Sequence, residues 1–180
     1  MYKRQTFIDI QDNTGGVICE PNEGMRVSVR GDVFTEDLEP VLDVNVSLIE
    51  DVLEDLTDDI GEYAFDNMPI GSSYILTPEK QFDYLNGVST LDIIFIQKHI
   101  LGSELLESPY KLIAADINNS GSITAIDLIE LRKLILGIYD ELPANSSWRF
   151  INEEQSFIDP LNPWSTELQE EFFILSLIHI

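Results

Sequence analysis

Two apolar segments of the chain have nearly the same sequence and end in the same way. STLDIIFIQKHILG (residues 89–102) and TAIDLIELRKLILG (residues 124–137) align at an offset of 35 residues. This offset places Asp92 on Asp127, Lys98 on Lys133 and Gly102 on Gly137. Apolar residues recur at helical spacing, and the final glycine is typical of a helix C-terminus. The pattern predicts a duplicated helical element.

A polar segment precedes each helix, and the second one, DINNSGSITAID (residues 116–127), has oxygen donors at calcium-loop spacing. A calcium loop of about twelve residues supplies ligands from positions 1, 3, 5, 7, 9 and 12. Here those positions hold Asp116, Asn118, Ser120, Ser122 through its backbone carbonyl, Thr124 and Asp127. Gly121 stands at position 6, where such a loop turns sharply. We expect a Ca²⁺ site of moderate affinity, since only two ligands are carboxylates. The alternative is a polar turn that caps the helix through Thr124.

The corresponding segment before the first helix, QFDYLNGVSTLD (residues 81–92), keeps fewer of these donors. Its positions 3, 7, 9 and 12 hold Asp83, Gly87, Ser89 and Asp92. Position 1 is Gln81, a poor replacement for aspartate, and position 5 is Leu85, which cannot ligate. We therefore expect one Ca²⁺ in the second loop and a first loop that is weak or has lost calcium.

Residues 25–80 alternate apolar and polar positions in short runs separated by turns, as in RVSVRGDVF, DVNVSLI, GEYAF and SSYILTP. This period predicts a small antiparallel β-sandwich. The acidic run EDVLEDLTDDIGEY is interpreted as a charged sheet edge that opposes aggregation. The predicted fold class is multi-domain β plus α: a small antiparallel β-sandwich followed by a duplicated calcium loop–helix module over 81–138.

The outer segments complete the expected organisation. Residues 6–24 contain the strand-like TFIDIQDN, expected to finish an upstream β domain or to pair with the next strands of the chain, and then a glycine-rich linker. Residues 139–174 read as an aromatic-rich extended segment with one strand at SWRFI. MYKRQ and LSLIHI can be encoded by reverse-complementary strings that resemble a sequencing adapter. We expect 1–5 and 175–180 to be adapter read-through, and the chain to be a fragment.

Packing expectations follow from the same patterns. The two helices are expected to share an apolar stripe, formed by Ile129, Leu131, Leu134 and Ile135 against Ile94, Ile96, Ile100 and Leu101. His99 is interpreted as a semi-buried packing residue. Four aromatic side chains of the extended segment either stack on carbohydrate or belong to the core: Trp148, Phe150, Phe157 and Trp164.

Composition excludes several classes of function. The formal net charge is −23, from 33 acidic and 10 basic residues, which argues against nucleic-acid binding. No apolar run reaches the roughly 18 residues of a membrane span. The single cysteine, Cys19, excludes a disulfide within the chain, and two histidines make a zinc site unfavourable. No phosphate loop, nucleophile elbow or zinc-binding helix is present, so we expect no enzymatic activity.

The duplicated loop–helix pair resembles the type I dockerin domain over roughly 81–138, with aspartate at position 12 and a single exit helix after each loop. The segments GDVFTEDLEPVLDVNVSLI and DDIGEYAFDNMPIGSSYILTPEK resemble transthyretin-like or Cna B-type β-sandwich modules of bacterial surface proteins. That second resemblance implies that Gly61 opens a hairpin and that Tyr63 and Phe65 point into a core.

The dockerin resemblance implies calcium-ordered folding and docking of one helix face onto a cohesin, often in assemblies of polysaccharide-degrading enzymes. The contacting pair at positions 10 and 11 is commonly Ser-Thr, but here it is Thr90 with Leu91 and Ala125 with Ile126. The partner is therefore either a cohesin-like module or a neighbouring module of the same protein.

We expect a non-catalytic fragment of a secreted or cell-surface modular bacterial protein that acts in adhesion or protein assembly. The alternatives are an accessory part of a polysaccharide-degrading enzyme, whose catalytic domain lies outside this chain, and a spacer stiffened by calcium.

Overall fold

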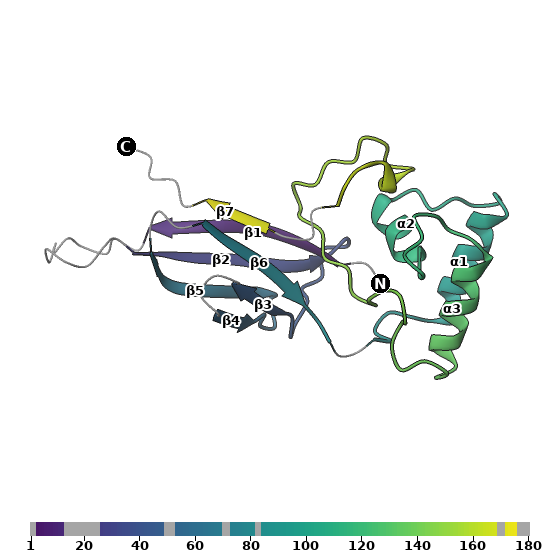
Figure 1. The fold of residues 1–180 in the computed structure, drawn as a ribbon, viewed down its shortest axis with the longest axis horizontal. Helices are drawn as coiled ribbons and strands as arrows, with labels where there is room; N and C mark the ends of the chain where they lie inside the picture. Colours follow the sequence, from purple (N-terminus) through teal and green to yellow (C-terminus); the bar gives the residue numbers. More distant parts are fainter. Residues whose placement is uncertain are drawn as a thin grey trace, which may run out of the picture. The chain divides into compact units, whose positions relative to one another are not determined.

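The structure is a computed structural model that describes residues 3–12, 26–48, 53–69, 73–81, 84–168 and 172–175. The predicted linker over 14–24 and most of the terminal segments lie outside these residues. The chain divides into two compact units (Figure 1). The β unit contains Arg4–Glu79, Phe150–Glu153 and a last strand, and the helical unit contains Lys80–Arg149 and Glu154–Leu168.

The β unit is built from two sheets. The strands are β1 (Lys3–Asp12), β2 (Arg26–Thr35), β3 (Asn45–Leu48), β4 (Leu53–Leu56), β5 (Glu62–Pro69), β6 (Ser73–Glu79) and β7 (Phe172–Leu175). One sheet has the order β1-β2-β5 and the other the order β4-β3-β6-β7. Strand β2 runs antiparallel to β5, and β3 runs antiparallel to both β4 and β6.

Alternation along the strands produces the core of the β unit. Val29 and Val33 on β2, and Val46 and Leu48 on β3, are essentially inaccessible to solvent; β3 alternates with half-buried residues, as does β2 from Val33 on, whereas Val27, Ser28 and Val29 are buried in succession. The rings of Tyr63 and Phe65 are both buried and meet edge to face, with centroids 6.0 Å apart. Antiparallel sheets followed by helices confirm the predicted β plus α class, and the face-to-face sandwich stays a prediction.

Gly61 lies in the turn that leads into β5. Its φ of +82° is in the left-handed region, and a Cβ added there would lie 2.7 Å from the carbonyl oxygen of Val33. The backbone N–H of Val33 donates to the Gly61 carbonyl at 2.9 Å. Only glycine fits so close a backbone approach.

Strand β4, which lies within the acidic run, is at the outer edge of the four-stranded sheet. This position agrees with the interpretation of the acidic run as a sheet edge. The carboxylate of Asp55 on β4 accepts a hydrogen bond of 2.7 Å from the backbone N–H of Ala64 on β5, in the other sheet. The Asp55 side chain therefore satisfies the backbone N–H of Ala64, a donor at the edge of β5 that does not pair with β2.

The β unit extends beyond the predicted 25–80 segment. Strand β1 lies beside β2, and β7 pairs antiparallel with β6 so that Tyr74 faces Ile174. The strand predicted over 147–151 is absent, because this segment is irregular and has only a bridge residue at Asn152. Pairing between segments so far apart in sequence leaves no local pattern, which explains why the tail was interpreted as extended.

The helical unit contains α1 (Thr90–Ile100), α2 (Pro109–Ala115), α3 (Ala125–Ile135) and the 3₁₀ turn η1 (Pro163–Ser165). Figure 1 shows α1 and α3 side by side. Both helices end in the predicted way: Gly102 and Gly137 follow the C-caps with φ of +67° and +66°. Helix α2 was not predicted; Ser108 caps its N-terminus and Pro109 occupies its first turn.

The predicted apolar stripe is only half correct. Ile96, Leu131 and Leu134 are buried and pack in one cluster with Ala115, Ile117, Leu128 and Leu142. The other members of the predicted stripe on α1, together with Ile129, are exposed: Ile94 49 %, Ile100 38 %, Leu101 71 % and Ile129 48 %. Helices with apolar residues on more than one face give no sequence signal that separates core from surface. His99 is half-buried, and its Nδ1 accepts from the Leu106 N–H at 3.1 Å.

Asp32 on β2 gives the β unit a pH-dependent stability. Burial raises the pKa of this carboxyl above its ordinary 3.8, and the charges of Glu62 and Glu153 raise it further. At neutral pH, where the Asp32 carboxyl is charged, the raised pKa therefore lowers the stability of the folded state. In acid this cost disappears, because Asp32 is protonated in both the folded and the unfolded state. We expect Asp32→Asn to raise the melting temperature of the β unit by about one to three degrees at neutral pH. Thermal unfolding at about pH 3 should show no gain, and an equal gain there would contradict this cause.

Candidate metal centre

The predicted second loop connects α2 to α3, so both of its ends are anchored in helices. Asp116, at position 1, is the C-cap of α2, and Thr124, at position 9, is the N-cap of α3. Asp127, at position 12, lies in the first turn of α3. Asp116 and Asp127 are 2 % and 0 % exposed. The loop therefore buries both of its carboxylates at the two ends of one short connection.

The Asp116 carboxylate organises the middle of the loop. Its Oδ1 accepts from the backbone N–H of Ser120 at 2.8 Å, and its Oδ2 accepts from the N–H of Gly121 at 2.7 Å. The Ser120 hydroxyl lies 3.4 Å from Oδ1 and donates to the Ser122 carbonyl at 3.1 Å. Positions 1, 5 and 7 thus meet through one connected set of oxygen atoms.

The Asp127 carboxylate closes the loop from the other end. Its Oδ2 accepts from the N–H of Thr124 at 2.7 Å and from the Thr124 hydroxyl at 3.1 Å, which forms a capping box. Its Oδ1 accepts from the N–H of Asn118 at 3.1 Å. The capping that the alternative interpretation expected is present, and it occurs within the loop register rather than in place of it.

Asn118, at position 3, has an oxygen without a partner. Its Oδ1 is buried and forms no hydrogen bond. A buried polar atom without a partner costs stability, so such an atom requires an explanation. The next turn is tight: Asn119 and Gly121 have φ of +55° and +75°. In a loop with this curvature, an unsatisfied amide oxygen in the same segment as two buried carboxylates is suited to a hard cation.

The donor set is carboxylate-poor. Among the described residues, no group of three or more His, Cys, Asp and Glu side chains could hold a metal. The loop instead offers two carboxylates, one amide oxygen, hydroxyls and a backbone carbonyl. All of these are hard oxygen donors, which suit Ca²⁺ and do not suit zinc. The residues present fit calcium, and the assignment of each as a ligand stays a prediction.

The first loop ends in the same kind of capping box as the second loop but differs from it at the preceding positions. Ser89 caps α1, and the Asp92 carboxylate accepts from the Ser89 N–H at 2.7 Å, as Asp127 does with Thr124. Gly87 has a φ of +71°. Leu85 is 50 % exposed and Gln81 is also exposed. Asp83 lies outside the described residues. Asp92 is half-buried, whereas Asp127 is fully buried.

Three residues near the second loop were missed by sequence analysis as parts of this site. Asn145 and Arg149 form hydrogen bonds with residues of the loop, and the ring of Trp164 lies near Gly121. No motif links them to the loop, because they lie in an irregular segment.

The aromatic side chains considered for carbohydrate have other contacts: Trp148 is buried, and Phe157 meets Tyr110 edge to face at 5.6 Å. The described residues offer no support for a carbohydrate partner.

No helix of the described chain is long and apolar enough to cross a membrane. In comparisons with known proteins, no curated protein and no solved structure matches the chain. A family model does match part of the helical unit, from Asn86, position 6 of the first loop, to Leu136, the C-cap of α3. Residues 86–136 match the model of the dockerin type I domain, and this match supports a type I dockerin domain in the helical unit.

Proposed function

We propose that the helical unit is a calcium-dependent docking module that joins this chain to a cohesin-like partner. The observation that carries the proposal is the combination in one loop of two buried carboxylates and the unpartnered Oδ1 of Asn118. Dockerin domains generally bind Ca²⁺ and are non-catalytic, and the match over 86–136 supports this class.

Electrostatics supports a cation in the second loop. Asp116 and Asp127 form no salt bridge with a described residue, although both are buried. Backbone and hydroxyl donors stabilise the two charges, but burying two carboxylates in one loop without a cation is costly. A bound Ca²⁺ would supply the compensating charge and order the loop. The ligands would be Asp116, Asn118, Ser120, Ser122 through its backbone carbonyl, Thr124 and Asp127. For the first loop we propose at most weak binding.

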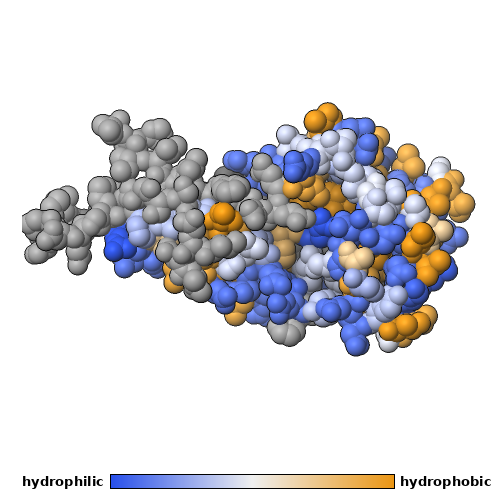
Figure 2. Space-filling model, viewed as in Figure 1, coloured by the Kyte–Doolittle hydropathy of each residue, from blue (hydrophilic) through white to orange (hydrophobic). Residues whose placement is uncertain are grey.

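The surface of α1 and α3 supports docking. The pair at positions 10 and 11 is exposed in both copies, and its second members, Leu91 and Ile126, are 53 % and 55 % exposed. Ile94 and Ile129, one turn further along each helix, are exposed to a similar degree. Figure 2 shows apolar side chains on the surface of the molecule around these helices. Exposed apolar residues on both helices are typical of a surface that binds protein. We propose that this surface, termed the apolar face, contacts the partner.

The wider protein is proposed to be secreted or attached to a bacterial surface. The β unit would then act as a Cna B-like spacer or adhesion module, and the helical unit would make the attachment. Because dockerins act in modular polysaccharide-degrading systems, an accessory role beside a catalytic domain outside this chain is the second candidate.

Capture experiments test the proposal directly. The whole chain should bind at least one member of a panel of immobilised cohesin modules in calcium and should be released by a chelator. Binding that persists in chelator, or no capture by any cohesin in calcium, would contradict a calcium-dependent cohesin-type docking function.

A further inference from the structure

Two residues outside the dockerin match, Asn145 and Arg149, form hydrogen bonds with the second loop. We propose that Asn145 and Arg149 are positioning residues that hold the second loop in its binding conformation and slow the release of Ca²⁺. The inference rests on the proposed calcium site and adds to it, because both residues lie outside 86–136 and contact the loop without supplying a predicted ligand.

Asn145 fixes the start of the loop. Its Nδ2 donates to the backbone carbonyl of Asp116 at 2.9 Å. Asp116 is the C-cap of α2, so its carbonyl lies at a helix end, where acceptors need partners from elsewhere. The Asn119 N–H also approaches this oxygen, at 3.3 Å, but the Asn145 bond is shorter. A side chain far along the chain therefore sets the backbone position of the residue that offers the first predicted ligand.

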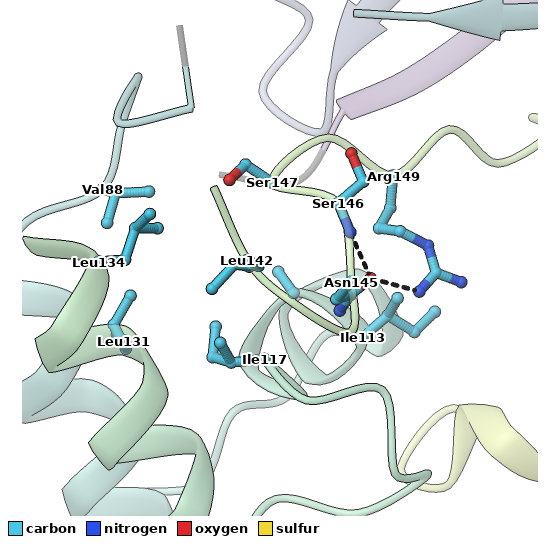
Figure 3. A pocket seen from close by; sticks show the side chains of 11 residues that line it. Val88, Ile113, Ile117, Leu131, Leu134, Leu142, Asn145, Ser146, Ser147 and Arg149 are labelled. Carbon is cyan, nitrogen blue, oxygen red and sulfur yellow. Dashed lines mark hydrogen bonds between the residues drawn. The ribbon is translucent and has the colours of Figure 1, made fainter. Parts of the chain in front are cut away.

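Arg149 connects Asn145 to the turn of the loop. Its Nη1 lies 3.1 Å from the Oδ1 of Asn145 and 3.1 Å from the Oδ1 of Asn119, at loop position 4. Figure 3 shows Asn145 between Arg149 and the backbone of Ser146, whose N–H donates to the same Oδ1 at 2.9 Å. Because these bonds of Arg149 go to amide oxygens, the carboxylates of Asp116 and Asp127 remain for the cation.

The ring of Trp164 lies near the turn of the loop. A Cβ added at Gly121 would lie 3.8 to 3.9 Å from the Trp164 ring, so the indole faces loop position 6 across a space that one added carbon would fill. Trp164 belongs to η1, which contacts α2. The loop is thus hydrogen-bonded at positions 1 and 4 by Asn145 and Arg149, and the Trp164 ring lies near position 6.

A cavity of about 40 Å³ lies behind Asn145 (Figure 3). Asn145, Ser147 and Arg149 line its polar side, and Ile117, Leu131 and Leu142 line its apolar side. This space exceeds what one water molecule needs. Truncating Asn145 would therefore enlarge an existing cavity at its polar side, where water can enter, and the main effect should fall on the loop rather than on the folding of the unit.

Preorganisation explains why such a brace would matter for calcium. A loop already held in its binding conformation has less conformational freedom to lose when the ion binds, and outer contacts of this kind commonly tune metal affinity. We expect the contacts of Asn145 and Arg149 to keep the loop in its binding conformation while Ca²⁺ is bound. Their loss should therefore increase the rate of calcium release.

The test compares wild type with Asn145→Ala in the whole chain. Stopped-flow release of Ca²⁺ into a fluorescent chelator should be about tenfold faster in the variant. The melting temperature should fall less in chelator than in calcium, because the lost bonds also support the loop without the ion. Asn162→Ala is the matched control, because Asn162 is exposed, lies in the same tail and makes no side-chain capping bond. It should release calcium at the wild-type rate.

Two results would overturn the brace. One is calcium release from Asn145→Ala at the wild-type rate. The other is an equal fall in melting temperature with and without calcium at unchanged affinity, which would show a purely structural role. Both leave the calcium site itself intact in wild type. Failure of wild type to bind Ca²⁺ would instead overturn the proposed function together with the brace.

Discussion

Calcium added to chelated protein is expected to raise the melting temperature of the helical unit by about ten degrees, and Asp116→Ala should remove most of that rise. A ligand that binds only the folded state stabilises it by about 2.7 kcal/mol at a free concentration of about 100 times its Kd. Asp116 supplies position 1, and its two oxygens hold the backbone of Ser120 and Gly121. Its removal takes away both a charge and the loop's internal frame. Far-ultraviolet circular dichroism against temperature measures the effect.

The two capping boxes provide a second test variant, Asp127→Ala, and its control, Asp92→Ala. Asp127→Ala and Asp92→Ala each remove the carboxylate that bonds to the N-cap residue, so each should cost about 1 kcal/mol of cap stability. Only Asp127→Ala should also remove the calcium-induced rise. An unchanged rise in Asp116→Ala, or an equal loss in Asp92→Ala, would contradict the assignment of the site to the second loop.

The double variant Leu91→Asp with Ile126→Asp is expected to weaken binding to a cohesin-type partner by at least about a hundredfold. Both side chains are more than half exposed, at 53 % and 55 %. Full burial of such a side chain at an interface is worth about 1.5–3 kcal/mol, and each 1.4 kcal/mol is a tenfold change in Kd. Aspartate removes that contribution and adds the cost of desolvating two charges. Surface plasmon resonance in calcium measures the change.

Ile60→Asp is the control for the apolar face. Ile60 is 54 % exposed but belongs to the β unit. This variant should bind the partner as wild type does, and both variants should keep the wild-type calcium response. A double variant that binds with wild-type affinity would place the partner on another surface.

Much of the helical unit was predictable because its signals are local. Ser89 and Asp92, and Thr124 and Asp127, sit at the spacing of a capping box, and each helix ends at a glycine with positive φ. The loop between α2 and α3 spans the residues of the predicted register, from the C-cap Asp116 to Asp127 in the first turn of α3, and their assignment as calcium ligands stays a prediction. Interactions between residues about four positions apart leave a pattern in the sequence, and the capping boxes and helix ends of this unit are interactions of that kind.

The parts that were not predictable depend on contacts between distant segments. Strand β7 was not foreseen because pairing with β6 has no counterpart in local alternation. Asn145 and Arg149 reach the loop from an irregular segment, where polar residues resemble those of any surface turn. The apolar stripe was half wrong for a related reason. Ile94 and Ile129 have helical spacing, but a face that binds a partner has the same pattern as one that packs in a core.

The central claim is that one calcium ion binds this chain in the loop of Asp116 and Asp127. Isothermal titration of Ca²⁺ into chelator-treated protein tests it most directly, with Asp116→Ala titrated beside wild type. We expect one site per chain in wild type, and its loss in the variant. Absence of binding in wild type, or two sites of equal affinity, would contradict the claim.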